Sequence, residues 1–368
     1  MSAKPWAIAG GGIAGLATAI ALAKTGRDVQ VFEKTAAFAP IGAGLQLGPN
    51  AVRALQSLGI WDAVSPYCAT PHEIVIRDGI SGSRLQSIDL TQKFANKFGA
   101  PYRVILRADL HSALVHSCAD FANIKFNMAS KWSGNVHDIE ALIAADGIWS
   151  SLRDEIAPNS KPIFLPHCIH RALVPLPVQA DKDAVTLWLY PEGHVVHYVV
   201  GNPARLNIVC VTKGSSNAQV WDNKTGSSAI YQHFKNANVE LNTTLSLIKN
   251  WTIWPATHVP QLSTWTNGNT LLIGDAAHGT APYLAQGAAM AVEDAALLGA
   301  LVKKNVSISE MFSKFETIRK PRTWRHHQTA LANAKIYHAS GALRHARNFT
   351  LQLMPQAIFL NRLTWLYQ

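Results

Sequence analysis

Short apolar runs and a longer helical pattern alternate in the first part of the chain. Residues 7–9 form an apolar run typical of a strand buried on both faces, and residues 28–32 predict a second strand. Between them, residues 13–24 are rich in Ala, Leu and Ile and predict a helix that Gly26 ends. Three glycines at 10–12 interrupt the apolar stretch, which favours strand, turn and helix over a signal peptide or a membrane segment. The pattern predicts a βαβ unit and therefore a parallel sheet.

The middle of the chain has a different pattern. Helical patterns at 50–58 and 107–117 and an apolar run at 141–145 continue the first one. Between about 165 and 265, short Val-, Leu-, Trp- and Tyr-rich runs are separated by Gly, Pro and Asn, as is typical of an antiparallel sheet. Residues 270–273 again resemble a buried parallel strand, and a helical pattern follows. The chain is therefore predicted to leave its first domain and return to it.

The predicted fold is α/β. A Rossmann-type (GR2) domain is interleaved with a smaller α+β domain that has an antiparallel sheet, and C-terminal helices follow. The 368 residues suffice for two interleaved domains. The predicted segments are 1–70, 101–164 and 266–330 for the first domain, 71–100 and 165–265 for the second, and 331–368 for the C-terminal helices.

Composition indicates a folded enzyme without disulfides. Hydrophobic residues make up 48% of the chain and charged residues 15%. The four cysteines are widely separated and form no ligand cluster, so we expect no metal site and a reducing, cytoplasmic location. The net charge of +10 suits anionic small molecules. The basic residues are scattered and no nucleic-acid-binding motif is present, so we expect neither nucleic acid nor a membrane as partner.

A glycine-rich turn joins the first strand to the first helix. Gly10, Gly12 and Gly15 have the GxGxxG spacing, and Glu33 follows eighteen residues after Gly15. In a βαβ unit these glycines allow a tight turn, close approach of a pyrophosphate and close packing of helix and strand. The helix N-terminus offers N–H groups to phosphates, and Glu33 can accept hydrogen bonds from ribose hydroxyls. The motif predicts a dinucleotide, NAD or FAD, with a ligand-free turn as the alternative.

Other stretches resemble the class A flavoprotein aromatic monooxygenases, of the salicylate, 3-hydroxybenzoate and 6-hydroxynicotinate hydroxylase type. Residues 144–153 (AADGIWSSLR) resemble their DG motif, and residues 272–278 (LIGDAAH) with 282–287 (PYLAQG) resemble their GD motif and the following helix. Arg107, in LRADL, matches an arginine that begins a helix near the flavin. The segment that passes the edge of the flavin ring is matched by Gly42, Gly44 and Gly48. This resemblance covers nearly the whole chain and implies FAD.

The resemblance also implies the residues that hold FAD. Asp275 would accept hydrogen bonds from the ribityl hydroxyls of FAD. Its alternative role is the N-cap of the next helix. The helix that begins near Gly287 would stabilise the anionic reduced flavin, with ordinary helix packing as the alternative. Asp146 and Arg153 would serve FAD and reduced nicotinamide, and a surface ion pair is their alternative. The expected cofactor residues are Gly10, Gly12, Ala14, Gly15, Glu33, Lys34, Gly44, Arg107, Asp146, Asp275, Gly287 and Ala288.

The substrate residues follow from strand alternation and the resemblance together. His194 and Tyr198 lie four apart on a predicted strand and share one face. The resemblance implies that this face meets the substrate, with His194 as a proton acceptor. An ordinary histidine, satisfied or facing solvent in a loop, is the alternative. His197 would point the other way and be structural. Three more positions map to the site: Gln46 and Tyr283 at the substrate and Pro282 near flavin C4a.

The implied function is hydroxylation of a small phenolic or carboxylated aromatic substrate by an NAD(P)H- and FAD-dependent monooxygenase. In the family, O2 and reduced flavin give a C4a-hydroperoxide, from which the protein excludes water. No second nucleotide motif distinguishes NADH from NADPH. Two alternatives remain: a membrane hydroxylase of prenylated quinone precursors, suggested by apolar residues 349–366, and a non-catalytic FAD-binding protein. Both a monomer and a homodimer are compatible with the sequence.

The chain departs from the family pattern at three places. Gly279 stands where proline usually follows the histidine of the GD motif, and Gln46 stands where some relatives have histidine. The segment 124–141 is too short for the two strands that the family usually has there. We therefore expect no histidine base at position 46 and a shortened sheet edge.

Overall fold

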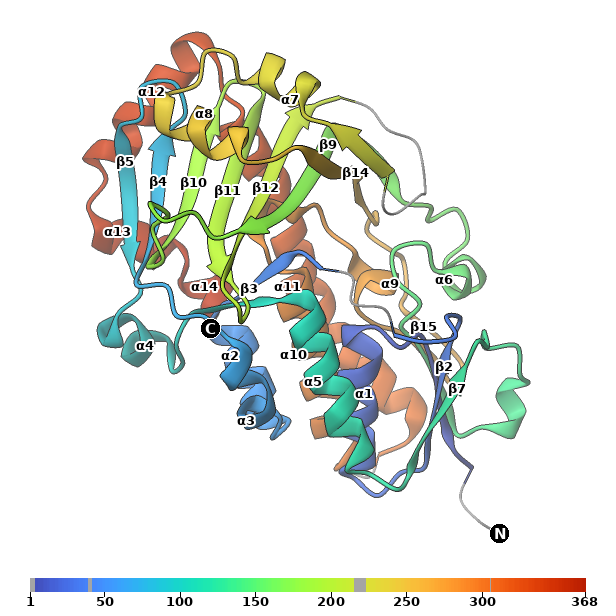
Figure 1. Cartoon of the computed structure of the whole chain (residues 1–368). Helices are drawn as coiled ribbons and strands as arrows, with labels where there is room; N and C mark the ends of the chain where they lie inside the picture. The colour runs from blue at the N-terminus through green and yellow to red at the C-terminus, as the bar shows by residue number, and fades with distance from the viewer. Residues whose placement is uncertain (1–3, 39–41, 215–222, 305) are drawn as a thin grey trace.

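Two sheets organise the chain in a computed structural model that describes residues 4–38, 42–214, 223–304 and 306–368 (Figure 1). The first sheet has six strands in the order β15-β16-β8-β1-β2-β7. Their bounds are Thr266–Asn267, Thr270–Leu272, Ala141–Ala144, Trp6–Ala9, Val29–Glu33 and Ile124–Met128, respectively. β1 pairs in parallel with β2 and β8, and only the short β15 in this sheet is antiparallel to its neighbour. The predicted parallel βαβ sheet is confirmed.

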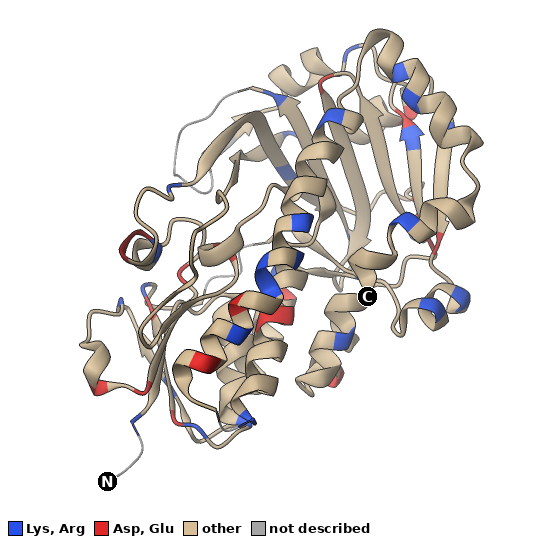
Figure 2. Cartoon of the chain, turned by 180° about the vertical axis from the view of Figure 1, so that it is seen from behind, with Lys and Arg blue, Asp and Glu red and all other residues tan. Residues whose placement is uncertain are grey.

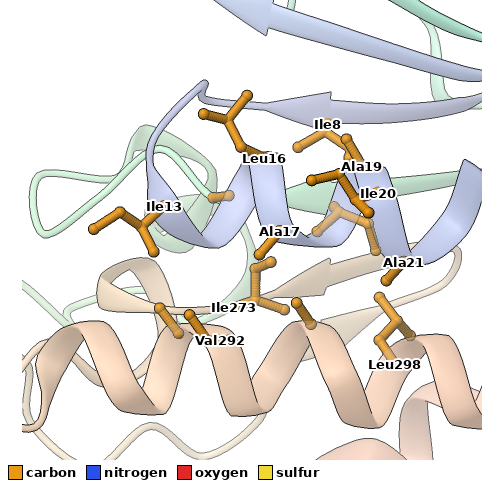
Figure 3. Close-up of a cluster of buried hydrophobic side chains, with 14 of the residues drawn as sticks. Ile8, Ile13, Leu16, Ala17, Ala19, Ile20, Ala21, Ile273, Val292 and Leu298 are labelled. Atoms are coloured by element: carbon orange, nitrogen blue, oxygen red, sulfur yellow. The ribbon is translucent and has the colours of Figure 1, made fainter. Parts of the chain in front are cut away.

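Two helices pack together beside this sheet. α1 (Ile13–Ala23) contacts α10 (Gly287–Val302) along much of its length. Figure 3 shows the buried side chains between them, where Val292 and Leu298 of α10 face Ala17 and Ala21 of α1. Each fully buried aliphatic side chain of this kind contributes about 1.5–3 kcal/mol relative to an exposed one. This packing connects the GxGxxG turn to the segment that follows the GD motif.

The second sheet has eight strands in the order β13-β14-β9-β12-β11-β10-β4-β5. Their bounds are Asn223–Gly226, Asn250–His258, Ile163–Pro175, Arg205–Lys213, Gly193–Val200, Ala184–Tyr190, Glu73–Asp78 and Arg84–Asp89. All neighbouring pairs are antiparallel except β10 and β4, which are parallel. One face is covered by α7 (Ser228–His233) and α8 (Val239–Ser246), and the C-terminal helices lie on the opposite side (Figure 1).

Other segments connect the two sheets. β3 (Gly44–Leu47) and β6 (Arg103–Leu106) form a two-stranded antiparallel sheet, and α5 (Arg107–Ala119) directly follows β6. The 30-residue helix α11 (Ile308–Tyr337) continues without a break across the segment boundary expected at residue 330. The remaining helices and single turns are α2 (Pro49–Ser57), α3 (Trp61–Val64), η1 (Ser65–Tyr67), α4 (Gln92–Phe98), η2 (Val136–Asp138), α6 (Ser151–Ile156), α9 (Asp275–His278), η3 (Pro282–Leu284), α12 (Gly341–Leu353), α13 (Gln356–Arg362) and α14 (Thr364–Tyr367). Among the described residues no helix combines the length and apolar character needed to cross a membrane.

Candidate active site

The three motif glycines of the first turn meet different local requirements. Gly10 has φ +110°, and a Cβ there would lie 2.3 Å from the carbonyl oxygen of Ala145. A Cβ on Gly15 would lie 1.9 Å from the carbonyl oxygen of Gly10, so the helix can follow the strand this closely only with glycine. A Cβ on Gly12 would meet nothing within 4 Å. Since no side chain caps α1, the open space at Gly12 and the first N–H groups of the helix fit a pyrophosphate.

Glu33 at the end of β2 is part of the same turn. Its carboxylate accepts hydrogen bonds from the backbone N–H of Gly11 at 2.8 Å and of Thr35 at 2.9 Å. Partial burial opposes ionisation, but these hydrogen bonds outweigh it and lower the pKa of Glu33. The neighbouring Lys34 is exposed. The Glu33 carboxylate is therefore ionised and fixed in position beside the turn. A carboxylate that binds ribose hydroxyls needs both properties.

The GD motif lies directly against the GxGxxG helix. Gly274 has φ +57°, and a Cβ there would be 2.8 Å from the Cβ of Ala14. Asp275 is the first residue of α9 and makes no side-chain cap hydrogen bond, so the alternative N-cap role is wrong. Its side chain is exposed, but partial desolvation by the surrounding protein raises the pKa of Asp275, and His278 and then Arg107 oppose this shift. Arg107 likewise makes no side-chain hydrogen bond within the described residues. Asp275 and Arg107 therefore lie near each other without forming a direct ion pair. A ribityl hydroxyl could donate to Asp275, and a phosphate could bind Arg107.

The N-terminus of α10 also leaves donors free. Its N-cap residue, Gln286, makes no cap hydrogen bond with its side chain. A Cβ on Gly287 would meet nothing within 4 Å, and Ala288 is half-buried. Ala289, by contrast, is fully buried in the core, so ordinary packing explains that residue. The first turn of a 16-residue helix is therefore open to the edge of a flat ring.

The DG motif forms the turn before α6. One carboxylate oxygen of Asp146 accepts from the backbone N–H of Ser151 at 3.0 Å, and the other has no partner among the described residues. Arg153 is 1% exposed and donates to the carbonyl oxygens of Ile148 and Ala276. The alternative of a surface ion pair between Asp146 and Arg153 is therefore wrong. Arg153 instead ties the DG turn to the GD helix.

The two residues expected to meet the substrate, His194 and Tyr198, lie on β11 as alternation predicts. His194 and Tyr198 pair with Val211 and Asn207 on β12 and share one face of the sheet. His197 is on the opposite face, where it accepts a hydrogen bond from the indole of Trp188 at 3.0 Å. His194 is 4% exposed within a strand, so its alternative position in a solvent-facing loop is wrong.

Tyr198 joins this face to the strand β3. Its hydroxyl is hydrogen-bonded to Gln46, whose Oε1 also accepts from the hydroxyl of Tyr102 at 2.5 Å. The backbone N–H of Gly44 donates to Oδ1 of Asn207 at 2.7 Å. A Cβ on Gly44 would lie 2.6 Å from the Tyr198 ring, so only glycine fits this contact. Gln46 and Tyr198, expected separately, therefore lie side by side.

His194 and Tyr283 form a second group on the same side. Their ring centroids are 5.6 Å apart, and Tyr283 follows Pro282, the first residue of η3. Nδ1 of His194 is 2.8 Å from Nε2 of His338, a residue that sequence reasoning did not select. The hydroxyl of Tyr283 is hydrogen-bonded to Nδ1 of His167 at 3.0 Å. The predicted site residues are thus divided between two neighbouring groups on one sheet face.

Comparison with known proteins decides the family. The model of the FAD binding domain family matches residues 5–330. The chain is 33% identical to 3-hydroxybenzoate 6-hydroxylase of Polaromonas naphthalenivorans (strain CJ2), over 99% of this chain and 95% of that protein. The chain belongs to the FAD-dependent aromatic monooxygenases. The expected family, fold class, flavin cofactor and enzyme class are confirmed.

Further relatives of this FAD-dependent monooxygenase agree with that assignment. The 6-hydroxynicotinate 3-monooxygenase of Bordetella bronchiseptica is 30% identical, over 81% of this chain and 82% of that protein. Among solved structures, a salicylate hydroxylase substrate complex has a TM-score of 0.81 at 23% identity and covers 100% of this chain and 95% of its own. Klebsiella pneumoniae HpxO complexed with FAD and uric acid has a TM-score of 0.85 at 21% identity, covering 99% and 97%. These structures show the shared fold. The comparisons support neither the membrane quinone-precursor hydroxylase nor the non-catalytic protein.

One feature of this monooxygenase that the sequence did not indicate is a buried ionic network between α10 and α11. Asp294 accepts from the backbone N–H of Gly274 at 2.8 Å and lies 2.6 Å from Nε2 of His278. Arg319 of α11 donates to Asp294 at 2.6 Å and to Glu293 at 2.5 Å. Figure 2 shows red and blue ribbon segments meeting in the middle of the molecule. The network fixes the GD motif, α10 and α11 relative to one another.

Arg171 is a second missed residue. It lies on β9 opposite Val209, on the same sheet face as His194 and Tyr198. Its guanidinium stacks over the Trp254 ring at 4.1 Å and forms no ion pair or hydrogen bond within the described residues. Burial lowers the pKa of Arg171 to about 10. Sequence alternation could have placed Arg171 on this face, but only the second sheet's strand order brings it near Tyr198.

Proposed function

We propose that this monooxygenase hydroxylates a small phenol that carries a carboxylate, and that Arg171 pairs with the carboxylate. The proposal rests on Arg171, a cation on the sheet face of His194 and Tyr198 that has no anionic partner within the described residues. A half-buried cation without a counter-charge is partly desolvated, so an anionic ligand would stabilise it. The relatives' names also support it, because 3-hydroxybenzoate and 6-hydroxynicotinate each combine a ring hydroxyl with a carboxylate.

The remaining roles follow from position. Gly12, Glu33, Arg107, Asp275 and the open end of α10 would hold FAD, which supplies the reaction of O2 with reduced flavin and transfer of one oxygen atom to the ring. NADH or NADPH would reduce the flavin. The other expected cofactor residues, from Gly10 to Ala288, retain the roles proposed from the resemblance.

The proposed substrate pocket needs a proton acceptor and polar side chains that orient the ring. Within the described residues the His194 ring is hydrogen-bonded through Nδ1, which leaves Nε2 available to a phenol. Removing the phenolic proton makes the ring more electron-rich and therefore more reactive toward an electrophilic oxygen. Tyr198 with Gln46 would orient the ring, and Pro282 with Tyr283 would close its other side. The proposed location stays cytoplasmic, in keeping with four free cysteines, and the segment division stays a prediction.

A panel of hydroxybenzoates, hydroxypyridine carboxylates and their uncharged amides tests this proposal. Each compound is added to the FAD-loaded enzyme with NADH or NADPH, and product and peroxide are both measured. We expect product from at least one acid and little from its amide. Arg171→Met should raise KM for that acid by about 10- to 150-fold, since a hydrogen bond to a charged group is worth about 1.5–3 kcal/mol.

Arg325→Met is the matched control, because Arg325 stacks over an aromatic ring, that of Trp365 at 4.2 Å, on an exposed part of α11. It should leave KM unchanged. Equal turnover of acid and amide, or an unchanged KM in Arg171→Met, would contradict the proposal that Arg171 binds the substrate carboxylate. No product from any compound would contradict the substrate class itself.

A further inference from the structure

One face of α5 meets the GxGxxG turn between β1 and α1. Arg107 is the first residue of α5, and His111 lies one turn further along, so both side chains are on the same face of this helix. α5 packs beside α1, as Figure 1 shows. Nε2 of His111 is 2.7 Å from the carbonyl oxygen of Gly11, the residue between the first two motif glycines. The sequence indicated Arg107 as a cofactor residue, whereas no pattern indicated His111.

The hydrogen bond fixes where His111 carries its proton. A carbonyl oxygen can only accept a hydrogen bond, so Nε2 of His111 must be the donor. Burial lowers the pKa of His111 and outweighs the hydrogen bond to Gly11, which raises it. Arg107 and Glu33 have smaller effects of opposite sign. His111 is therefore a neutral imidazole near pH 7, with its single ring proton on Nε2.

Gly11 is held on both sides of its backbone. Its N–H donates to the Glu33 carboxylate at 2.8 Å, while its carbonyl oxygen accepts from His111. The residue is buried, and a Cβ on it would lie 2.7 Å from Cε1 of Phe38. Phe38 also packs edge-on against the His111 ring, with the two centroids 4.9 Å apart. Glu33, Phe38 and His111 therefore fix the middle of the turn together.

The orientation of Gly11 determines the orientation of the next N–H group. The peptide bond between Gly11 and Gly12 is trans, and in a planar trans peptide the C=O and the N–H point in opposite directions. Because the carbonyl of Gly11 points at His111, the N–H of Gly12 points away from it. No described residue accepts a hydrogen bond from this N–H. The turn therefore presents the N–H of Gly12 as a donor just before the N–H groups that begin α1.

We infer that His111 is a positioning residue for FAD, which sets the peptide between Gly11 and Gly12 so that the N–H of Gly12 faces the pyrophosphate. This inference rests on the proposed function, because it takes the pyrophosphate to lie at Gly12. His111 acts through Gly11 and does not itself touch the cofactor. A turn that is fixed before FAD arrives loses less conformational freedom on binding, so the hydrogen bond strengthens FAD binding without adding a contact.

Packing of α5 against the turn is the competing role for His111. The two roles differ in what they require of the side chain. Packing requires a side chain of similar size, whereas positioning requires a donor at the place of Nε2. The amide nitrogen of a glutamine at this position can occupy roughly the place of Nε2, but that of an asparagine reaches only about as far as Nδ1. These two amides therefore separate the roles.

The test compares His111→Gln with His111→Asn in the FAD-free protein. Flavin fluorescence during a titration measures the Kd for FAD. His111→Asn should raise this Kd about tenfold, the effect expected of one lost hydrogen bond to a buried group, and His111→Gln should stay within about threefold of the wild type. A wild-type Kd in His111→Asn would overturn the inference. Equal losses in both variants would favour packing and contradict positioning.

Ligands that contain only part of FAD locate the effect. ADP contains the pyrophosphate and adenosine does not, so each is titrated as a competitor of FAD. His111→Asn should weaken ADP binding about tenfold and leave adenosine binding unchanged. Equal weakening of both ligands would place the effect at the adenosine and not at the pyrophosphate, against the inference.

His116→Asn is the matched control, because His116 is also on α5 but is exposed and bonds the carbonyl oxygen of Ser112 within its own helix. Its Kd for FAD should equal that of the wild type. A similar rise in Kd for His116→Asn would indicate general damage to α5 and contradict a specific role for His111.

A measurement on the wild-type protein remains decisive if His111→Asn does not fold. Nitrogen-15 chemical shifts of the FAD-free protein at pH 7 should show His111 as the tautomer protonated on Nε2, assigned by the loss of its signal in His111→Gln. Protonation on Nδ1 would refute the hydrogen bond to Gly11 and with it the inference. No aromatic substrate is present in any of these measurements, so the proposed substrate class can fail while the role of His111 stands, and the reverse also holds.

Discussion

Arg319 donates a hydrogen bond from Nε to Asp294 at 2.6 Å in a region where both side chains are buried. Asp294 also accepts from the backbone N–H of Gly274, the residue before Asp275. The proposed ribityl-binding carboxylate is therefore held in place by a cation on α11, far from it in the sequence. Burial opposes ionisation of Asp294, but His278 and Arg319 outweigh it and lower its pKa.

Replacing Arg319 should destabilise the protein strongly. Arg319→Met leaves Asp294 and Glu293 buried without their main cation, and breaking a buried pair in this way costs about 3–5 kcal/mol. The free energy of unfolding in urea measures the loss. Lys320→Met is the control, because Lys320 forms a partly exposed pair with Glu316 and donates to the carbonyl oxygen of Ser263 near the surface. It should cost less than about 1 kcal/mol. A loss as small as this in Arg319→Met as well would show that the network adds little.

His326 should make stability depend on pH. It is 0% exposed, neither ring nitrogen has a partner among the described residues, and burial lowers its pKa to about 3. The unfolded chain takes up a proton below about pH 6.5, while the folded protein does not, so stability falls as pH decreases below that value. Between pH 6.5 and 5 the loss from one such histidine is about 2 kcal/mol.

His326→Phe should remove this part of the pH dependence. Phenylalanine has a similar shape and can keep the ring contact with Trp365, whose centroid is 5.0 Å away. Urea unfolding at pH 7 and pH 5 should therefore show a smaller difference for the variant than for the wild type. His345→Phe, at an exposed position on α12, should show the wild-type difference. An unchanged pH dependence in His326→Phe would contradict the assignment.

The sequence predicted those parts of the site that depend on local pattern. The βαβ unit, the GxGxxG turn and the shared face of His194 and Tyr198 all follow from the spacing of residues along one or two elements. The contact of Gly44 with Tyr198 was not predicted as such, but both residues were selected because the family resemblance covers each of them.

The site residues that the sequence did not indicate are brought together only by the tertiary structure. His338 and His167 are 171 residues apart, and Arg319 is 25 residues from Asp294 on a different helix. No periodicity relates such positions, because their proximity depends on how α11 packs against α10 and against the second sheet. Arg171 lacked a signal for a related reason: an arginine on a strand resembles an ordinary surface residue until the order of the strands is known.

The glycines of the first turn allow cofactor binding and folding to be separated. A Cβ on Gly12 would meet no protein atom within 4 Å, so Gly12→Ala should leave the stability of the FAD-free protein nearly unchanged. The same methyl group would occupy the space proposed for the pyrophosphate, so FAD affinity should fall at least about tenfold, or about 1.4 kcal/mol. Gly15→Ala places its Cβ 1.9 Å from a backbone oxygen and should destabilise the FAD-free protein itself. Urea unfolding without FAD and fluorescence titration with FAD measure the two effects. Unchanged FAD affinity in a stable Gly12→Ala variant would place the pyrophosphate elsewhere.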